Sequence, residues 1–499
     1  MSQSVLERYL ANNPDAVKNP EMLAFVAQLE TVSQVAPEIA ASIVKELADQ
    51  RSNIKLIASE NFSSLSVQYA MGNLLTDKYA EGFPRHRFYA GCDNVDDIEE
   101  VACREAEALF GADHAYVQPH SGADANMVAF WSVLMWKIQS PYLEEIGKKN
   151  LYDLSKEEWD EIRKQLGNQR LLGLDYYSGG HLTHGYRYNV SAQMFDAYSY
   201  GVNRETGLLD YDEIEKMAME IKPLILLAGY SAYPRKIDFA RMREIADKVG
   251  AVLMVDMAHF AGLVAGKVFT GNYNPVEHAH IVTSTTHKTL RGPRGGLILC
   301  KQELAEYVDK GCPMVLGGPL PHVLAAKAVA FKEARKKDFE TYAHKIVENS
   351  QALAEELKKR NITIATGGTD NHLMLIDVRP FGITGRQAEA AVRECGITLN
   401  RNALPYDPNG PWYTSGLRIG TPAVTSLGMG KNEMAEIADL FALILGNIKP
   451  TETDGKISKA KYTLDDNIKK QAKEKVQNLL DRFPLYPSLD LNFLKKEFK

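Results

Sequence analysis

The feature that most limits the fold is an alternation of short apolar runs with helical periods between residues 102 and 300. The apolar runs are too short for helices, whereas the segments between them repeat apolar residues every three or four positions. Strands interleaved with helices predict an α/β domain with a mostly parallel sheet. The strand-like runs are 115–120, 223–229, 251–260, 280–288 and 295–300, and the helix-like segments are 102–113, 121–136 and 238–250.

The chain is longer than this domain requires, because 499 residues correspond to two or three domains of ordinary size. Residues 321–360 form one long helix-like stretch that can bridge to a second domain. We therefore expect an N-terminal helical arm over 1–60, a large domain over 61–340 and a smaller α+β domain over 341–499. A highly charged segment at about 137–173 interrupts the large domain and is expected to be a helical surface insertion.

Charge and cysteine content exclude several classes of partner. The formal net charge is -6, with 58 basic and 64 acidic residues, which gives no broad basic surface for nucleic acid or an anionic membrane. The five cysteines are widely spaced, with no Cys-x-x-Cys pair, so a disulfide framework or a zinc site is not favoured and a cytoplasmic location is expected. The first 35 residues lack the apolar core of a signal peptide, and no run is long enough to span a bilayer.

Polar residues stand at the predicted strand ends, where α/β proteins bind ligands. Ser121 and Gly122 begin a helix and can offer free N–H groups to a phosphate, although many helices start with such a pair as a plain cap. Asp256 ends an apolar run, where a carboxylate needs a cationic partner or a structural hydrogen bond. His181 and His259 are residues of a type that is more often structural than catalytic. Zinc at Asp256 and His259 lacks further ligands at a recognisable spacing.

Lys288 suggests that these residues belong to one cofactor site. It follows another apolar run, within VTSTTHKTLRGPRGG from Val282 to Gly296. A lysine near a phosphate cup, an acid for a ring nitrogen and an aromatic group for stacking describe a pyridoxal phosphate site, in which the lysine holds the cofactor as a Schiff base. Arg418 offers the planar fork that suits a substrate carboxylate, although an interdomain salt bridge explains it equally well.

Short motifs spread from about Leu56 to Val424 resemble those of the serine hydroxymethyltransferase family. The resemblance implies a fold-type-I pyridoxal phosphate enzyme, with a mostly parallel seven-stranded sheet flanked by helices, a smaller C-terminal domain and an active site shared across a homodimer. The implied reaction is the reversible transfer of the serine hydroxymethyl carbon to tetrahydrofolate, giving glycine and 5,10-methylenetetrahydrofolate. The motifs are LIASENF (56–62), KYAEGFP (78–84), QPHSG (118–122), GGHLTHG (179–185), VDMAHFAGLVA (255–265), TSTTHKTLRGPRGG (283–296), GGTDNHL (367–373) and SGLRIGTPA (415–423).

The same resemblance implies roles for individual residues, carried over motif by motif. As catalytic residues it implies Lys288, Glu81, His287, Asp256 and His181. As the cofactor shell it implies Lys288, Ser121, Gly122, His181 stacked on the ring, Ser231, Asp256 at the ring nitrogen, His259 at the phenolic oxygen, and Tyr79 and Gly318 reaching the neighbouring subunit's phosphate. As substrate-binding residues it implies Ser59, Arg418, Tyr89 and Glu81, and as folate-binding residues Tyr176, Gly180, Leu182 and Asn402.

Some positions depart from the pattern of that family. Tyr176 and Ser178 stand where leucine and histidine are usual, and Ala123 replaces a serine of the phosphate cup. The charged insertion lies directly upstream of Tyr176, so we expect it to pack near the mouth of the folate pocket. These departures leave the reaction class unchanged and affect the expected folate affinity.

Two other functions fit part of the pattern. A folate-independent 3-hydroxy amino-acid aldolase, similar to threonine aldolase, would share the lysine and the arginine. An RNA-binding or scaffold protein on a retired enzyme fold would carry damaged cofactor residues, whereas Lys288, Asp256, His181 and Arg418 are all present.

Overall fold

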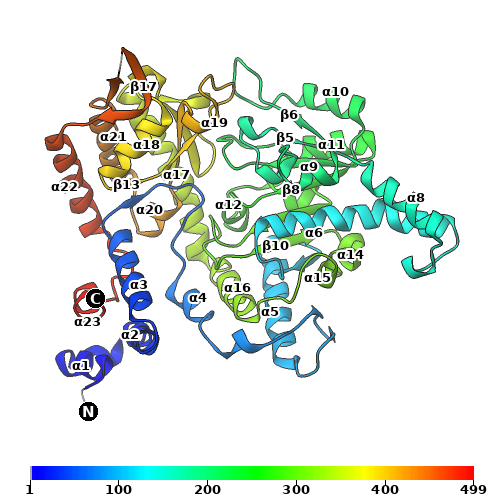
Figure 1. Ribbon diagram of the computed structural model, residues 1–499, viewed down its shortest axis with the longest axis horizontal. Helices are drawn as coiled ribbons and strands as arrows, with labels where there is room; N and C mark the ends of the chain where they lie inside the picture. The colour runs from blue at the N-terminus through cyan, green and yellow to red at the C-terminus, as the bar shows by residue number, and fades with distance from the viewer. Residues whose placement is uncertain (1–2, 454) are drawn as a thin grey trace.

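The computed structural model describes residues 3–453 and 455–499, and its centre is a seven-stranded sheet with helices on both faces (Figure 1). The strand order is β4-β10-β9-β8-β7-β5-β6. The five strands from β9 to β6 run parallel, and only β10 opposes its neighbours. The predicted α/β class with a mostly parallel sheet is therefore confirmed. The strands are β4 (His114–Tyr116), β5 (Arg170–Leu174), β6 (Asp196–Tyr200), β7 (Ile225–Gly229), β8 (Val252–Asp256), β9 (Ile281–Thr285) and β10 (Gly296–Cys300).

The central strands are covered on both faces, and β7 and β8 are nearly continuous apolar runs, whereas β9 ends in the buried hydroxyl residues Thr283, Ser284 and Thr285. Every residue of β7, β8 and β9 is buried, which is the usual condition of a parallel sheet packed between helices. Two hydrophobic clusters, one on each side of the sheet, take up alternate residues of these strands. The helices that contribute to these clusters include α5 (Asp93–Phe110), α6 (Gly122–Leu134), α11 (Phe239–Val249) and α16 (Pro321–Ala334).

A second sheet lies in the C-terminal half of the chain, at the upper left of Figure 1. It is antiparallel, in the order β11-β12-β15-β14, and has its own hydrophobic core. Its elements are β11 (Thr363–Ile364), β12 (Leu373–Asp377), β14 (Asn400–Asn402) and β15 (Gly416–Gly420), packed with α17 (Lys337–Lys359), α18 (Gly385–Glu394) and α21 (Lys431–Leu445).

The stretch predicted to be helical over 321–360 is helical, but it is not one continuous helix. The structure contains two helices, α16 and α17, separated where Lys336 adopts an extended backbone. Helix α16 packs on α5 of the large sheet, whereas α17 packs on α21 of the second sheet. The break lets each half bury its apolar face in a different core.

The two ends of the chain pack together. Helices α1 (Val5–Asn12), α2 (Pro20–Ser33) and α3 (Pro37–Gln50) share a hydrophobic cluster with α23 (Leu491–Glu497), at the lower left of Figure 1. The following strand, β1 (Ile54–Lys55), pairs in parallel with β13 (Ile397–Thr398) of the C-terminal half. We propose the division into an arm (1–60), a large domain (61–340) and a small domain (341–499) on this arrangement.

The charged insertion is helical, and it ends earlier than predicted. It comprises α7 (Ser140–Glu145) and α8 (Lys156–Gly167), and strand β5 already begins at Arg170. Helix α8 projects at the right edge of Figure 1 and carries the capping box Ser155–Glu158 at its start.

Among the described residues, no helix combines the length and the apolar character that a membrane crossing requires.

Candidate active site

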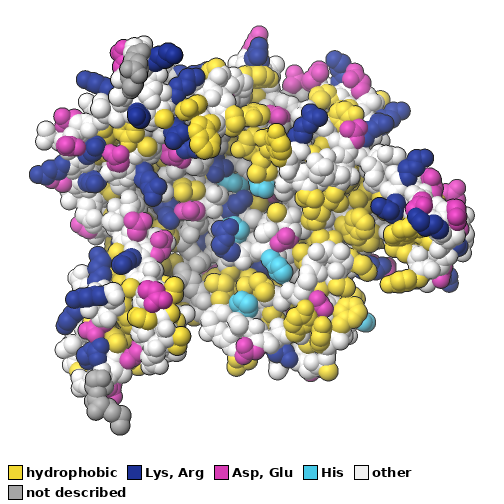
Figure 2. Space-filling view, viewed as in Figure 1, with side chains coloured by type: hydrophobic (Ala, Val, Ile, Leu, Met, Phe, Trp, Pro, Cys, Tyr) yellow, Lys and Arg dark blue, Asp and Glu magenta, His cyan; other side chains and the backbone are white. Residues whose placement is uncertain are grey.

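A cavity of about 510 Å³ opens between the carboxyl ends of the parallel strands and the second sheet. Such a position, beyond the strand ends of an open α/β sheet, is where these folds bind ligands. The space-filling view shows a hollow on this face with histidine side chains inside it (Figure 2). The residues singled out from the sequence that line the cavity are Ser59, Tyr176, Gly180, His181, Leu182, Ser231, His259, Lys288, Asn402 and Arg418.

Lys288 lies on the loop that follows β9, with its amine turned into the cavity. The pKa of Lys288 is lowered to about 8, chiefly by burial and also by Arg418 and Arg294, while Asp256 acts in the opposite direction. At pH 8 a large share of the side chain is therefore the neutral amine. A neutral amine is a nucleophile, so Lys288 can attack a carbonyl carbon.

Asp256 is the last residue of β8 and is buried beneath the cavity. Its carboxylate accepts hydrogen bonds from Asn126 Nδ2 (2.9 Å) and the Ala258 N–H (3.0 Å), and His184 Nε2 lies 3.3 Å away. Burial alone would raise the pKa of Asp256, but the contact with His184 and the nearby cationic groups hold it well below its usual range. The carboxylate therefore stays charged and can stabilise a cationic ring nitrogen.

A network of hydrogen bonds links His181 to the same carboxylate. His181 Nδ1 lies 2.8 Å from Thr183 Oγ1, and Asn126 Nδ2 donates to that hydroxyl (2.7 Å) as well as to Asp256. Burial lowers the pKa of His181 to about 4, so the imidazole is neutral at physiological pH. Its ring can therefore lie against another flat ring at no cost in charge desolvation.

His181, His184 and Asp256 each offer one possible ligand atom, a ring nitrogen or a carboxylate oxygen. These three atoms lie within 4.8 Å of one another, close enough to hold a metal ion. We favour a hydrogen-bonded role for this trio, because the Asp256 carboxylate is already engaged by Asn126 and the backbone of Ala258. The negative charge of the Asp256 carboxylate can then be balanced by a cationic ring nitrogen.

The predicted phosphate cup is the N-terminus of α6. Ser121 caps this helix, accepting from the Asp124 N–H (3.2 Å) and donating to the Asp124 carboxylate (2.9 Å). A Cβ on Gly122 would lie 2.7 Å from Thr285 Cγ2, so only glycine lets β9 approach the helix start this closely. The free N–H groups of the first turn and the helix dipole favour a bound phosphate.

Arg418 reaches the cavity from β15 of the second sheet. Nε donates to Asn400 Oδ1 (3.1 Å) and Nη1 to the Ser231 carbonyl (2.7 Å). Burial lowers the pKa of Arg418 to about 10, so the guanidinium stays charged at neutral pH. No carboxylate among the described residues forms a salt bridge with Arg418, so the interdomain ion pair that the sequence left open is not formed there.

A second group of predicted site residues lies outside this cavity. Tyr79 and Tyr89 each place a hydroxyl 3.4 Å from the Glu81 carboxylate, and both rings are largely exposed. A Cβ on Gly318 would lie 3.7 Å from Glu81 Cγ. None of these four residues lines the Lys288 cavity. His287 does not line it either; its Nδ1 accepts from the Gly295 N–H (3.3 Å).

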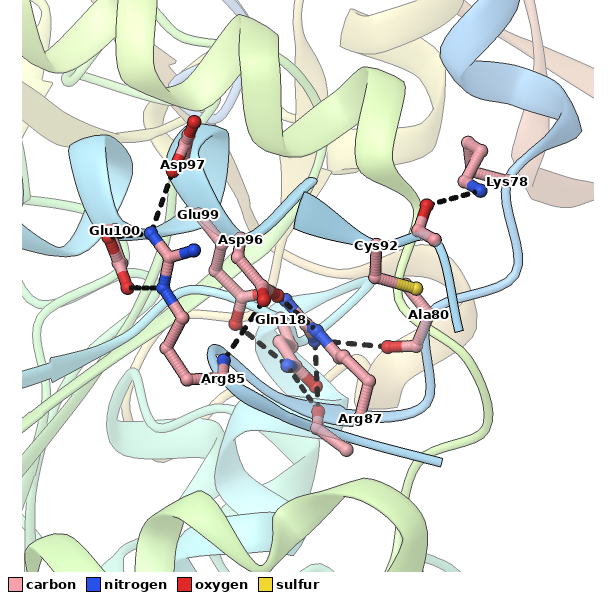
Figure 3. A network of polar contacts seen from close by, with 12 residues as sticks. Lys78, Ala80, Arg85, Arg87, Cys92, Asp96, Asp97, Glu99, Glu100 and Gln118 are labelled. Atoms are coloured by element: carbon pink, nitrogen blue, oxygen red, sulfur yellow. Dashed lines mark hydrogen bonds and ion pairs between the residues drawn. The ribbon is translucent and has the colours of Figure 1, made fainter. Parts of the chain in front are cut away.

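The backbone that carries Glu81 is held by a buried arginine (Figure 3). Arg87 Nη1 donates to the carbonyls on both sides of Glu81, those of Ala80 (3.0 Å) and Gly82 (3.1 Å). A Cβ on Gly82, whose φ is +100°, would meet the His86 carbonyl at 2.3 Å, so the tight hairpin requires glycine here. The carboxylates that balance Arg87 are those of Asp96 (2.8 Å) and Glu99 (2.6 Å).

Sequence reasoning missed Asn126, Thr183 and His184, which orient the two residues it found. His184 belongs to the GGHLTHG motif, and Asn126 lies one helical turn after Gly122 on the buried side of α6. The sequence signal that could have found Asn126 is its spacing. It stands four residues after Gly122, so one helical turn brings its amide to the same side of α6 as the start of the helix.

Comparison with known proteins identifies close relatives over nearly the whole chain. The sequence model of the family described as serine hydroxymethyltransferase matches residues 32–139 and 164–441, and the gap between the two matches falls on α7 and α8. Proteins named serine hydroxymethyltransferase are 62% identical in Treponema pallidum (100% of this chain, 87% of the relative) and 58% identical in Salinispora tropica (95% and 99%). Another from Chlamydia trachomatis is 51% identical (98% and 99%).

Proposed function

We infer that this chain, which belongs to the serine hydroxymethyltransferase family, reversibly transfers the hydroxymethyl carbon of serine to tetrahydrofolate, giving glycine and 5,10-methylenetetrahydrofolate. The observation that carries the proposal is the convergence of Lys288, Asp256 and Arg418 on one region of the molecule. A nucleophilic amine, a permanent carboxylate and an unpaired guanidinium are what an enzyme needs to hold pyridoxal phosphate and an amino acid together.

The residues fit pyridoxal phosphate as the cofactor. Ser121 and Gly122 would hold the phosphate at the start of α6, and Lys288 would attach covalently to the aldehyde carbon. Asp256 would keep the proton on the ring nitrogen, because its carboxylate is buried and charged. Bound pyridoxal phosphate supplies an electron sink for breaking bonds at the α-carbon of an amino acid. The remaining proposed contacts are His181 against the ring, Ser231 in the cofactor shell and His259 at the phenolic oxygen.

The substrates would enter from the side of the second sheet. Arg418, together with Ser59, would bind the carboxylate of serine or glycine and orient its α-carbon. Tetrahydrofolate would lie along the outer wall of the cavity, whose residues are Tyr176, Gly180, Leu182 and Asn402.

Glu81 has to come from another copy of the chain for the site to be complete. It is the proposed proton carrier for the serine hydroxyl, yet it lies outside the Lys288 cavity of its own chain. The exposed side chains of Tyr79 and Tyr89 lie beside it, as on a surface that meets a partner. We therefore propose a homodimer in which Tyr79, Glu81, Tyr89 and Gly318 serve the neighbouring site, with His287 shaping reaction specificity.

The competing activity is a folate-independent 3-hydroxy amino-acid aldolase. An absorption spectrum of the purified cofactor-loaded protein with glycine, recorded before and after adding tetrahydrofolate, separates the two. A new visible band that requires the folate supports the transferase. A spectrum that is identical with and without folate favours the aldolase.

We propose a cytoplasmic location, which suits the five unpaired cysteines.

Substitution of Arg418 by lysine is expected to raise the KM for serine about 30-fold with a smaller change in kcat. A single ammonium cannot replace two parallel hydrogen bonds to a carboxylate, a loss of about 2 kcal/mol. Steady-state serine titrations measure this directly. The exposed Arg163→Lys on α8 is the matched control and should leave the KM unchanged; an unaltered KM in Arg418→Lys would remove this residue from the substrate site.

The insertion was predicted to pack near the mouth of the folate pocket, and the single chain does not place it there. No residue of 140–168 lines the Lys288 cavity or the adjacent cavity beside Tyr176 and Tyr186. Replacing residues 144–166 with a short Gly/Ser linker is therefore expected to leave the KM values for tetrahydrofolate and allo-threonine unchanged. The melting temperature should fall, because the linker removes the buried side chain of Ile162 and leaves its apolar neighbours exposed. A selective change in the folate KM would place the insertion at a folate site after all.

A further inference from the structure

Two buried histidines meet where the large sheet and the second sheet face each other. His259 stands three residues after the end of β8 and lines the Lys288 cavity, whereas His372 stands directly before β12. His259 is 2% exposed and His372 is fully buried. His259 Nδ1 lies 3.3 Å from His372 Nε2. We call these two residues the histidine pair.

The two rings of the pair meet edge to edge. Their centroids are 5.5 Å apart and their planes differ by 29°. The centroid separation is the 3.3 Å between the two nitrogens plus about one ring radius on each side, so both nitrogens lie close to the line that joins the centroids. A proton on one nitrogen therefore points at the lone pair of the other, which is the geometry of a hydrogen bond.

The backbone beside His372 is tied to the loop that follows β7. Asn371 Nδ2 donates to Tyr230 Oη (3.0 Å) and to the Tyr233 carbonyl (3.1 Å). The second sheet therefore holds His372 against His259 through a fixed, hydrogen-bonded connection rather than through a loose loop.

Each ring of the pair is neutral and carries a single N–H. Burial lowers the pKa of His372 to about 3, with Arg418 and Lys288 acting in the same direction. Burial also holds the pKa of His259 well below its usual range, and the same two cations and the neighbouring histidines add to this effect. A hydrogen bond between two neutral imidazoles needs a proton on one of the facing nitrogens and a lone pair on the other.

The second nitrogen of His372 decides which ring donates. His372 Nδ1 is buried and has no hydrogen-bond partner among the described residues. A proton on Nδ1 would be a buried N–H without an acceptor, and such orphaned donors are rarer than acceptors left unused. The proton of His372 is therefore on Nε2 and faces His259 Nδ1. His259 then carries its own proton on Nε2, which no residue of the described ranges binds.

We propose that His372 is a positioning residue, which donates to His259 Nδ1 and so holds the Nε2–H of His259 as a donor towards the cavity. The inference rests on the proposed function, which puts the phenolic oxygen of pyridoxal phosphate at His259. A donor held at that place stabilises the phenolic oxygen in its negatively charged form. The second sheet thereby controls the protonation of a cofactor that the large sheet binds.

Neutron diffraction from crystals of the cofactor-loaded protein, exchanged into heavy water, locates these protons directly. Deuterium is expected on Nε2 of both His372 and His259, and on Nδ1 of neither. Deuterium on Nδ1 of either ring would overturn the proposal.

Two substitutions separate the donor from the bulk of the side chain. The amide of His372→Gln can place an N–H near the position of Nε2, whereas His372→Leu has no donor. The absorption of the bound cofactor against pH gives the midpoint at which its phenolic oxygen takes up a proton. His372→Leu is expected to raise this midpoint by about one pH unit, a tenfold weaker preference for the charged oxygen, and His372→Gln to keep it. His344→Leu, at an exposed position of α17, is the matched control and should also keep it.

Folate-dependent serine turnover of the unmodified protein separates this inference from the proposed function. Turnover combined with deuterium on Nδ1, or with an unshifted midpoint in His372→Leu, overturns the role of His372 alone. A protein that binds no pyridoxal phosphate, or that shows no folate-dependent turnover, overturns the proposed function. Circular dichroism and melting temperatures establish that the variants are folded, and if His372→Leu does not fold, the diffraction result decides.

Discussion

Lys288→Ala is expected to reduce the turnover of serine by several orders of magnitude while pyridoxal phosphate still binds. The phosphate cup at Ser121 and Gly122 and the carboxylate of Asp256 remain, but no amine is left to attach to the aldehyde carbon. Turnover of the purified variant and the dissociation constant of the cofactor, from fluorescence titration of the apoprotein, measure the two effects.

The control for this substitution is Lys164→Ala on the exposed face of α8, which should keep full activity. A pH series adds a second check, because the neutral fraction of Lys288 grows as the pH rises through about 8. The rate at which the unmodified apoprotein captures the cofactor covalently should rise over the same range. Near-normal turnover in Lys288→Ala would show that this lysine is not the anchor.

Asp256→Asn is expected to lower kcat on the order of a hundredfold while the cofactor remains bound. The change removes the buried charge that would pair with the ring nitrogen of the cofactor, a loss of about 3 kcal/mol. Asn126 and His184 would then face a neutral amide, which cannot hold a proton on the ring nitrogen as a carboxylate does. Steady-state kinetics and the absorption spectrum of the bound cofactor, recorded against pH, measure the loss.

Asp160→Asn, an exposed acid on α8, is the matched control for charge removal. It should leave both the kinetics and the spectrum unchanged. If Asp256→Asn retained the rate and the spectrum of the unmodified protein, the ring nitrogen would have to be stabilised by another group.

The position of Asp256 at a strand end could be predicted from the sequence, because it ends an uninterrupted apolar run. The position of Lys288 just beyond a strand could be predicted from the shorter apolar start of that strand at Ile281 and Val282. The parallel strands then bring the two residues to one edge of the sheet. The contacts that tune them could not be predicted. Asn126 and His184 meet Asp256 across 130 and 72 residues of chain, and periodicity carries no information about such pairings.

The break between α16 and α17 was also beyond the sequence pattern. The run through Lys336 keeps its helical periodicity on both sides, and only the presence of two separate cores decides that the chain turns there. The position of Glu81 outside the cavity is a similar case, since its motif resembles the family's, and we propose that Glu81 serves the site of a second copy of the chain.

The most direct test of the proposed reaction follows the hydroxymethyl carbon itself. Serine labelled with ¹³C at its β-carbon is incubated with the cofactor-loaded protein, with and without tetrahydrofolate, and the products are identified by NMR. The proposed function predicts that the label appears in the methylene bridge of 5,10-methylenetetrahydrofolate, with unlabelled glycine formed in equal amount and only when folate is present. Glycine formed at the same rate without folate, or label remaining in serine under both conditions, would contradict it.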